Sequence, residues 1–289
     1  MQNMKEQINY SVVIPFRDSM EQLSVALKSI PDRKDIQVIV VDNSRDLFEE
    51  ELYPQYQNAT LTITSSEYGA GAGCARNVGL KLIEGEWLLF LDADDYFMVN
   101  AFDVFDNYKD TKYDIIFFKA DSLNLTTGER SKRHKTINKR IDCYLSSKDE
   151  DYLRYQFGNP VCKMIRSSLI SNNNIQFEEV KCSNDVMFSV KSGHLASTIT
   201  AVPIPVYMIT EAPSGVSLMT DRSAENSFIR FQVSIRKYAY LKSIGKTYLK
   251  PKFFSHIGNA FRYFGLKEAY KYIKYYYKNR NCRDSNTFA

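Results

Sequence analysis

Short runs of apolar, often β-branched residues recur through the first 120 residues, and segments with helical spacing of apolar positions separate them. Continuous apolar runs of this length are typical of parallel strands that are buried on both faces of a sheet. The predicted strands cover residues 11–16, 37–41, 61–64, 87–91 and 114–118. Because strands alternate with helices, the pattern predicts an α/β domain with a mainly parallel central sheet flanked by helices.

The pattern of apolar positions is less regular after residue 119. A polar stretch over 126–139 predicts an exposed hairpin or loop. Helical patterns follow at 149–157 and at 184–194, the second with Ser183 as its N-cap. A short strand is expected over 206–209, and the chain is helical in pattern from about residue 221 onward.

Charge separates the end of the chain from the rest. We expect one large domain over 1–220 and a helical, basic and aromatic C-terminal segment over 221–289. Residues 228–289 hold 14 of the 38 Lys and Arg residues but only 2 of the 34 Asp and Glu residues, a local net charge of +12. The remainder carries a net charge of −8, so an acidic body precedes a basic segment.

Lysines and aromatic residues of this segment form two stripes at helical spacing. One holds Lys267, Lys271, Lys274 and Lys278, and the other holds Leu266, Ala269, Tyr270, Ile273 and Tyr277. Such a helix suits an anionic membrane surface, although tyrosines packed on the first domain or on a second subunit would give the same pattern. No nucleic-acid-binding module accompanies the charge, so we expect no nucleic-acid partner.

Other features of the composition narrow the class of protein. No window approaches the roughly 18 consecutive apolar residues of a membrane-spanning helix, and the first ten residues are polar. We therefore expect a cytoplasmic protein, peripheral at the inner face of the cell membrane. The five cysteines include no CxxC pair, which argues against a disulfide framework or a cysteine zinc site.

Carboxylates follow three of the predicted strands. Asp18 comes after the first strand, Asp42 ends the second, and the run from Asp92 to Asp95 follows the fourth. A single Asp in such a place is usually a turn residue or a helix cap. Ligands of open α/β sheets bind at the carboxyl ends of the strands, however, so three carboxylate-bearing ends indicate a ligand site.

Asp92, Asp94 and Asp95 place three carboxylates in four positions, where like charges repel unless a cation is present. Mg²⁺ and Mn²⁺ take oxygen ligands and commonly bind carboxylates together with substrate phosphates. A calcium EF-hand loop does not fit, because Tyr96 and Phe97 stand where it needs an acidic residue or Asn and then Gly. The run therefore predicts a metal–diphosphate site with Mn²⁺ or Mg²⁺.

A glycine-rich segment, residues 69–79, lies between a predicted strand and a predicted helix. A dinucleotide fingerprint would need Gly or Ala where Cys74 stands, and it would normally follow the first strand. NAD binding is therefore disfavoured. The alternative is that glycines such as Gly73 let the backbone approach a ligand while Arg76 offers a bidentate donor to phosphate.

These motifs resemble, in order and spacing, the nucleotide-binding half of family 2 glycosyltransferases, GT-A fold enzymes that build bacterial surface polysaccharides. The residues that carry the resemblance are SVVIPFRD, VIVVDNS, GAGCARNVGL and WLLFLDADD. NPVCKMIR and the later Asn184-Asp185 pair are similar to the acceptor half of the same family. The resemblance implies a nucleotide-sugar-binding half over 9–119 and an acceptor half over 120–220.

The resemblance also implies roles for single residues. The implied donor-binding residues are Pro15, Phe16, Arg17, Asp18, Asp42, Ser44, Gly73, Arg76, Asp92, Ala93 and Asp94. Asp94 would hold the metal and Asp185 would be the catalytic base, with Asn184 in place of the usual Glu. Asp95, Lys163 and Asn184 would contact the acceptor or the diphosphate. From the residues alone, Asp185 could equally cap a helix and Lys163 could be a surface charge.

The sequence thus predicts a metal-dependent, inverting glycosyltransferase. It would move a sugar from a nucleotide-sugar, such as a UDP-sugar, to a hydroxyl group of a glycan or lipid-linked acceptor. Two alternatives stay open, a sugar nucleotidyltransferase and a non-catalytic binding module of the GT-A type. The first would release pyrophosphate rather than a nucleoside diphosphate.

Overall fold

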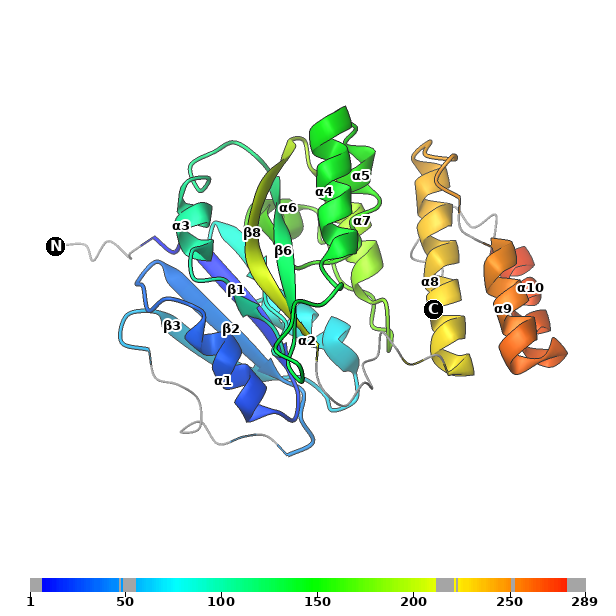
Figure 1. Cartoon of the computed structure of the whole chain (residues 1–289), viewed down its shortest axis with the longest axis horizontal. Helices are drawn as coiled ribbons and strands as arrows, with labels where there is room; N and C mark the ends of the chain where they lie inside the picture. The colour runs from blue at the N-terminus through cyan, green and yellow to red at the C-terminus, as the bar shows by residue number, and fades with distance from the viewer. Residues whose placement is uncertain are drawn as a thin grey trace.

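A single eight-stranded sheet forms the centre of a computed structural model that describes residues 7–46, 48, 56–211, 221, 223–250 and 253–279 (Figure 1). The strand order is β3-β2-β1-β4-β7-β6-β8-β5. The strands are β1 (Tyr10–Phe16), β2 (Ile36–Asp42), β3 (Thr60–Ser65), β4 (Trp87–Phe90), β5 (Tyr96–Phe97), β6 (Ile115–Asn124), β7 (Lys163–Arg166) and β8 (Ile199–Glu211).

The sheet is parallel in its first half and mixed in its second. β2 pairs in parallel with β1 and β3, and β1 pairs in parallel with β4. β7 is antiparallel to both β4 and β6, and β6 pairs in parallel with β8. Because β7 reverses direction between them, β4, β6 and β8 all point the same way. Their carboxyl ends therefore lie along one edge of the sheet.

Helices cover the sheet and continue beyond it. The helices are α1 (Met20–Lys28), α2 (Gly71–Leu80), α3 (Ala101–Asp106), α4 (Lys135–Ser147), α5 (Asp151–Arg154), α6 (Ser167–Asn172), α7 (Asp185–Leu195), α8 (Ala224–Ser243), α9 (Phe253–Phe264) and α10 (Leu266–Asn279). In Figure 1, α4, α5 and α7 lie between the sheet and the C-terminal helices α8, α9 and α10. These last three helices bury an apolar cluster of their own that includes Phe231, Ala260 and Tyr272.

The apolar runs form strands as predicted, because both faces of the central strands are covered. Every residue of β2 is buried, and β1 is buried except for one partly exposed position. Aromatic residues fill the space between the sheet and α3. Tyr10 packs edge-on against Phe102 and donates a hydrogen bond from its hydroxyl to Asp106 at 2.9 Å. The alternating pattern of strands and helices is therefore confirmed for the first half of the chain.

One prediction in the second half is wrong, and another is confirmed with bounds that are too short. Residues 135–139 belong to α4 rather than to an exposed loop, because Ile137, Ile141 and Tyr144 recur at helical spacing and are buried. The short strand expected over 206–209 is the end of the 13-residue strand β8. Pro203 and Pro205 interrupt the ladder of β8 with β6, where Phe118 pairs with Val202 but Ala120 pairs with Tyr207.

The start of α7 also differs from the prediction. Ser183 has a φ of 59°, in the left-handed region, and Asn184 is the residue that precedes the helix. Asn184 makes no side-chain capping bond, so its amide is available for another contact. β7 was not predicted at all, because its four residues carry no pattern that separates them from a helix.

Substitution of Gly79 tests the packing of α2 on the sheet. A Cβ at Gly79 would lie 2.5 Å from Cγ1 of Val13 in β1, so we expect Gly79→Ala to lower the free energy of unfolding by about 1–3 kcal/mol. Gly258→Ala in α9 is the matched control, because a Cβ there meets open space and alanine favours a helix by roughly 1 kcal/mol. Urea unfolding of both variants should show opposite shifts, and equal shifts would contradict the packing.

Candidate active site

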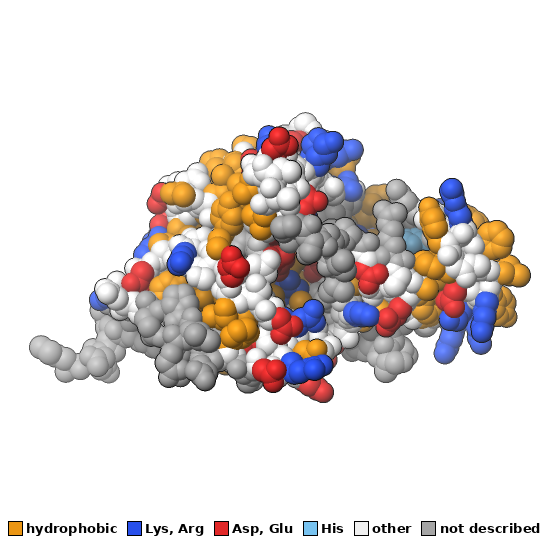
Figure 2. All heavy atoms as spheres, turned by 60° about the horizontal axis from the view of Figure 1, so that its bottom comes forward, with side chains coloured by type: hydrophobic (Ala, Val, Ile, Leu, Met, Phe, Trp, Pro, Cys, Tyr) orange, Lys and Arg blue, Asp and Glu red, His pale blue; other side chains and the backbone are white. Residues whose placement is uncertain are grey.

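The predicted site residues gather at the edge of the sheet where the strands have their carboxyl ends. Asp18 follows β1, Asp42 is the last residue of β2, and the acidic run follows β4. Arg76 comes from α2, and Asp185 opens α7. Figure 2 turns the lower side of Figure 1 toward the viewer and shows acidic and basic side chains interspersed on that face.

Hydrogen bonds tie the loops after β1 and β2 together. Asp42 is buried, and its carboxylate accepts hydrogen bonds from the amides of Ser44 at 2.9 Å and Phe48 at 3.3 Å. The Ser44 hydroxyl in turn accepts a hydrogen bond from the amide of Asp18, whose φ is 62°. The Phe16 ring is 2% exposed and packs against Phe48, so it lies in the core rather than on the site surface.

Gly73 has a packing role that its sequence context did not suggest. A Cβ at this position would lie 2.3 Å from the Glu178 carbonyl oxygen and 2.9 Å from Cβ of Asn184. The glycine therefore allows close packing of α2 on the segment before α7. The approach of a ligand to its backbone stays a prediction.

Arg76 joins the two halves of the site. Its guanidinium is buried and donates hydrogen bonds to Asp92 at 2.6 Å and to the Asn184 side-chain oxygen at 3.1 Å. It also lies 5.3 Å from the centre of the Phe177 ring. Within the described residues its Nε has no hydrogen-bond partner. Asn184 is neutral, so among the described residues Arg76 forms its direct ion pair with Asp92, while its charge also acts on Asp94 and Asp185.

The carboxylates after β4 form a compact group. Asp92, Asp94 and Asp95 each offer an oxygen atom, and these atoms lie within 4.8 Å of one another. Burial raises the pKa of Asp95 well above its usual range, and the charges of Asp94 and Asp92 raise it further. Burial and the Asp92 charge also raise the pKa of Asp94, whose side chain still reaches solvent.

Three neighbours of these carboxylates were not predicted from the sequence. The Thr210 amide donates to Asp95 at 2.8 Å, and the buried Tyr207 hydroxyl accepts a hydrogen bond from the Asp92 amide at 3.0 Å. Arg133 donates to the Thr210 carbonyl at 2.5 Å, and its charge lowers the pKa of Asp94. Arg133 lay in the stretch assigned to a loop, whereas Tyr207 and Thr210 carry no local sequence signal.

Asp185 and Lys163 lie close to Arg76 and to each other. Burial raises the pKa of the half-buried Asp185, and the nearby positive charges of Arg76 and Lys163 oppose that shift. Lys163 is 3% exposed, so the interpretation of this residue as a surface charge is wrong. Its amine donates to the Phe157 carbonyl at 3.3 Å and lies 4.8 Å and 5.2 Å from the ring centres of Phe157 and Phe117.

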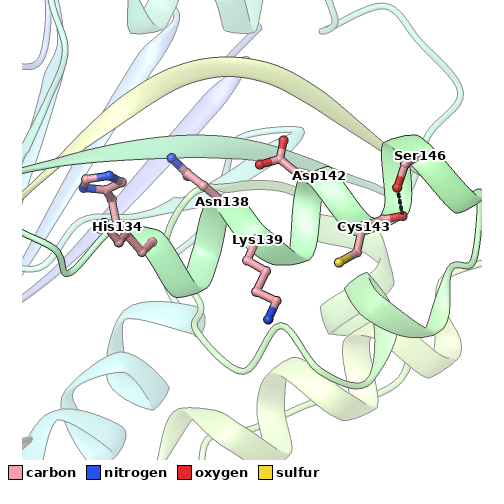
Figure 3. A pocket seen from close by; sticks show the side chains of 7 residues that line it. His134, Asn138, Lys139, Asp142, Cys143 and Ser146 are labelled. Carbon is pink, nitrogen blue, oxygen red and sulfur yellow. Dashed lines mark hydrogen bonds between the residues drawn. The ribbon is translucent and has the colours of Figure 1, made fainter.

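A separate hollow lies along one side of α4 and contains none of these residues (Figure 3). Its volume is about 500 Å³. The residues that line it are His134, Lys135, Asn138, Lys139, Asp142, Cys143 and Ser146. The Asp142 carboxylate is already paired with Lys119 at 2.7 Å, and the hollow is wide open to solvent. The carboxylate group after β4 is therefore the better candidate for chemistry.

Comparison with known proteins identifies the family of this chain. The family model for "Glycosyl transferase family 2" matches residues 11–172. The poly(ribitol-phosphate) beta-N-acetylglucosaminyltransferase TarS of Staphylococcus aureus is 26% identical to this chain over 214 residues. That match covers 69% of this chain and 35% of TarS, so the chain spans about a third of the length of that relative.

Solved structures share the fold. The crystal structure of S. aureus TarS 1-349 in complex with UDP-GlcNAc matches 92% of this chain and 79% of its own, with a TM-score of 0.69 and 23% identity. The mannosyltransferase PcManGT from Pyrobaculum calidifontis, in complex with GDP-Man and Mn²⁺, matches 93% of this chain and 79% of its own, with a TM-score of 0.57 and 13% identity. These likenesses confirm the predicted class of fold.

The buried amine of Lys163 should make stability depend on pH. Burial lowers the pKa of Lys163 to about 7, whereas a lysine in the unfolded chain titrates near about 10.4. Between these values the unfolded chain binds more protons, so the free energy of unfolding of the wild type rises with pH. Lys163→Met removes this term. We expect the variant to gain stability relative to the wild type most at pH 7 and below.

Urea unfolding of both proteins between pH 6 and pH 10 measures this difference. A packing defect of methionine would add a constant offset, which leaves the slope with pH intact. A difference that stays flat across the range would show that Lys163 keeps an ordinary pKa.

Proposed function

The chain belongs to glycosyl transferase family 2, and on that premise we propose that it transfers a sugar from a nucleotide-sugar donor to a hydroxyl group of a glycan or lipid-linked acceptor in polysaccharide biosynthesis. The observation that supports this most is the Arg76 bridge, which brings the carboxylates after β4 to the start of α7. The donor site and the candidate base are thereby held at one edge of the sheet.

We propose a UDP-sugar as the donor. The TarS structure with UDP-GlcNAc shares the fold, and the loops after β1 and β2 correspond to the base-binding part that the family resemblance implies. The acceptor hydroxyl could belong to a polyol phosphate polymer such as the poly(ribitol-phosphate) in the name of TarS. Arg76 supports the diphosphate assignment, because a guanidinium is a strong donor to phosphate and this one lies beside the acidic group, paired with Asp92.

In the proposed reaction, Asp185 takes the proton from the acceptor hydroxyl while that oxygen forms the new bond to the anomeric carbon. The bond from this carbon to the diphosphate breaks on the opposite face, and the nucleoside diphosphate leaves with the electron pair. Inversion follows from this single displacement. The positive charges of Arg76 and Lys163 favour the ionised form of Asp185, which is the form a base requires.

The acidic group suits a divalent cation. Three carboxylate oxygens within 4.8 Å, two of them with raised pKa values, form a hard-ligand set whose mutual repulsion a cation would relieve. Asp94 is the residue most open to solvent, so we assign it as the main ligand of Mn²⁺ or Mg²⁺. The cation would supply positive charge to the diphosphate as it leaves.

The two alternatives differ in what they release. A sugar nucleotidyltransferase would release pyrophosphate, and a non-catalytic module would release nothing. Two parallel incubations separate the three. One holds a panel of nucleotide-sugars and is scored for nucleoside diphosphate, and the other holds nucleoside triphosphates with sugar 1-phosphates and is scored for pyrophosphate. Slow hydrolysis of one donor to UDP would support the proposed function, and pyrophosphate release would overturn it.

We expect the affinity for UDP to depend on Mn²⁺ through Asp94. Without the cation a diphosphate meets the negative charges of the acidic group, so calorimetry should show much weaker UDP binding in EDTA. Asp94→Asn should remove most of the gain that Mn²⁺ gives, whereas Asp103→Asn, at an exposed position of α3, should keep it. Equal affinities of the wild type with EDTA and with Mn²⁺ would exclude this metal role.

Asp185 should affect turnover more than binding. Asp185→Asn cannot accept the proton, so we expect kcat to fall by a factor of about 100 or more while the affinity for the donor stays nearly unchanged. Near-normal turnover in this variant would show that Asp185 is not the base and serves only as an acidic residue in the first turn of α7.

The pH dependence of the wild type gives a second measurement on the same residue. Burial raises the pKa of Asp185, and the base form is lost as the pH falls through that pKa. We therefore expect kcat/KM to fall as the pH is lowered, and to begin falling at a higher pH than an ordinary Asp with a pKa of about 4 would give.

A further inference from the structure

The exposed side of α10 carries the apolar stripe that the sequence pattern predicts, except for Ala269. Ala269 and Tyr272 are buried, and α10 contacts α8 and α9. The exposed fractions of Leu266, Tyr270 and Tyr277 are 74%, 64% and 59%. Ala269 was expected to share their face, but it lies on the buried one. The helix therefore has two apolar faces, only one of which is used in the fold.

α9 adds to this surface. Phe254 and Phe261 are 86% and 58% exposed, and their spacing of seven residues puts them on one face of the helix. Figure 2 shows hydrophobic side chains gathered at the end of the molecule formed by α9 and α10, with lysine and arginine side chains projecting beside them. Large apolar groups gathered in this way on a protein surface mark sites of interaction.

Lysines run beside the apolar stripe of α10. Each of Lys267, Lys271, Lys274 and Lys278 lies one position after an exposed apolar residue, and all four are exposed. Only Lys271 forms an ion pair with a described residue, Glu268 at 2.6 Å. The face next to the apolar stripe therefore carries positive charge that the described part of the chain leaves largely uncompensated.

We propose that α9 and α10 dock on an anionic lipid surface. The two stripes match the two layers of such a surface, because aromatic and aliphatic side chains enter the acyl boundary while lysines reach the anionic headgroups. A second copy of the chain fits less well, since it would bring one lysine stripe against another. None of the described helices is long and apolar enough to cross a bilayer, so the contact is interfacial.

This inference goes beyond the proposed function and is tested without any sugar substrate. The full-length protein is mixed at low salt with vesicles of phosphatidylcholine alone or of equimolar phosphatidylcholine and phosphatidylglycerol, and flotation measures the bound fraction. We expect binding to the anionic vesicles only. About 1 M salt should release the protein, because it reduces the screening length to about 3 Å.

Two sets of substitutions separate the apolar and charged contributions. Tyr270→Ser with Ile273→Ser removes exposed apolar groups, and Lys267→Gln with Lys274→Gln and Lys278→Gln removes charges. Each set should lower the partition coefficient by about tenfold or more, because the first removes apolar area from the acyl boundary and the second removes cations near the anionic leaflet. The matched controls are Val25→Ser and Lys28→Gln, exposed positions of α1 that should leave binding unchanged.

Circular dichroism checks that each variant keeps its helices. Failure of the full-length protein to float with anionic vesicles at low salt would overturn the proposal, and so would binding that neither set of substitutions changes. Sedimentation velocity covers the remaining outcome. Self-association that Tyr270→Ser with Ile273→Ser abolishes, without vesicle binding, would show that a second copy covers this surface instead.

Discussion

The organisation of the site depends on one buried guanidinium. Arg76 reaches from α2 to Asp92 after β4 and to Asn184 before α7, two segments that are far apart in the sequence. A buried charge is costly unless it is paired and hydrogen-bonded, so these contacts must form together. The tight packing at Gly73, one turn earlier in α2, brings the same segment before α7 into reach. A single side chain therefore holds the carboxylates after β4 beside the start of α7.

The carboxylates around Arg76 have three different kinds of neighbour. Asp92 is paired with the Arg76 guanidinium, Asp95 accepts from the neutral amide of Thr210, and Asp94 lies beside solvent with Arg133 nearby. The negative charge of this group is thus only partly compensated. A diphosphate would add negative charge to this arrangement, which explains why the proposed function includes a divalent cation. Lys163 contributes from behind, in an aromatic environment that penalises its charge.

The parts of this structure that depend on local pattern could be predicted from the sequence. Buried strands show as apolar runs, and the Asp residues that follow them reach one edge because parallel strands share a direction. Arg133, Tyr207 and Thr210 could not be predicted, because they meet the acidic group through partners 77 to 116 residues away in the chain. The burial of Lys163 likewise depends on the place of β7 between β4 and β6. The four residues of β7 carry no sequence pattern that predicts this place.

The irregular pairing around Pro203 and Pro205 fixes the phase of β8. Phe118 pairs with Val202, and Ala120 pairs with Tyr207. Between these two pairs, β8 contains three more residues than β6. An odd number inverts the alternation of side chains between the two faces of a sheet. The irregular pairing thus determines which side chains of β8 lie on the face of the acidic group. Tyr207, whose hydroxyl accepts a hydrogen bond from the Asp92 amide, comes directly after it. Removal of one residue here would invert the alternation, so side chains that now face the core would face the site and the reverse. This short stretch should therefore tolerate a change of length poorly.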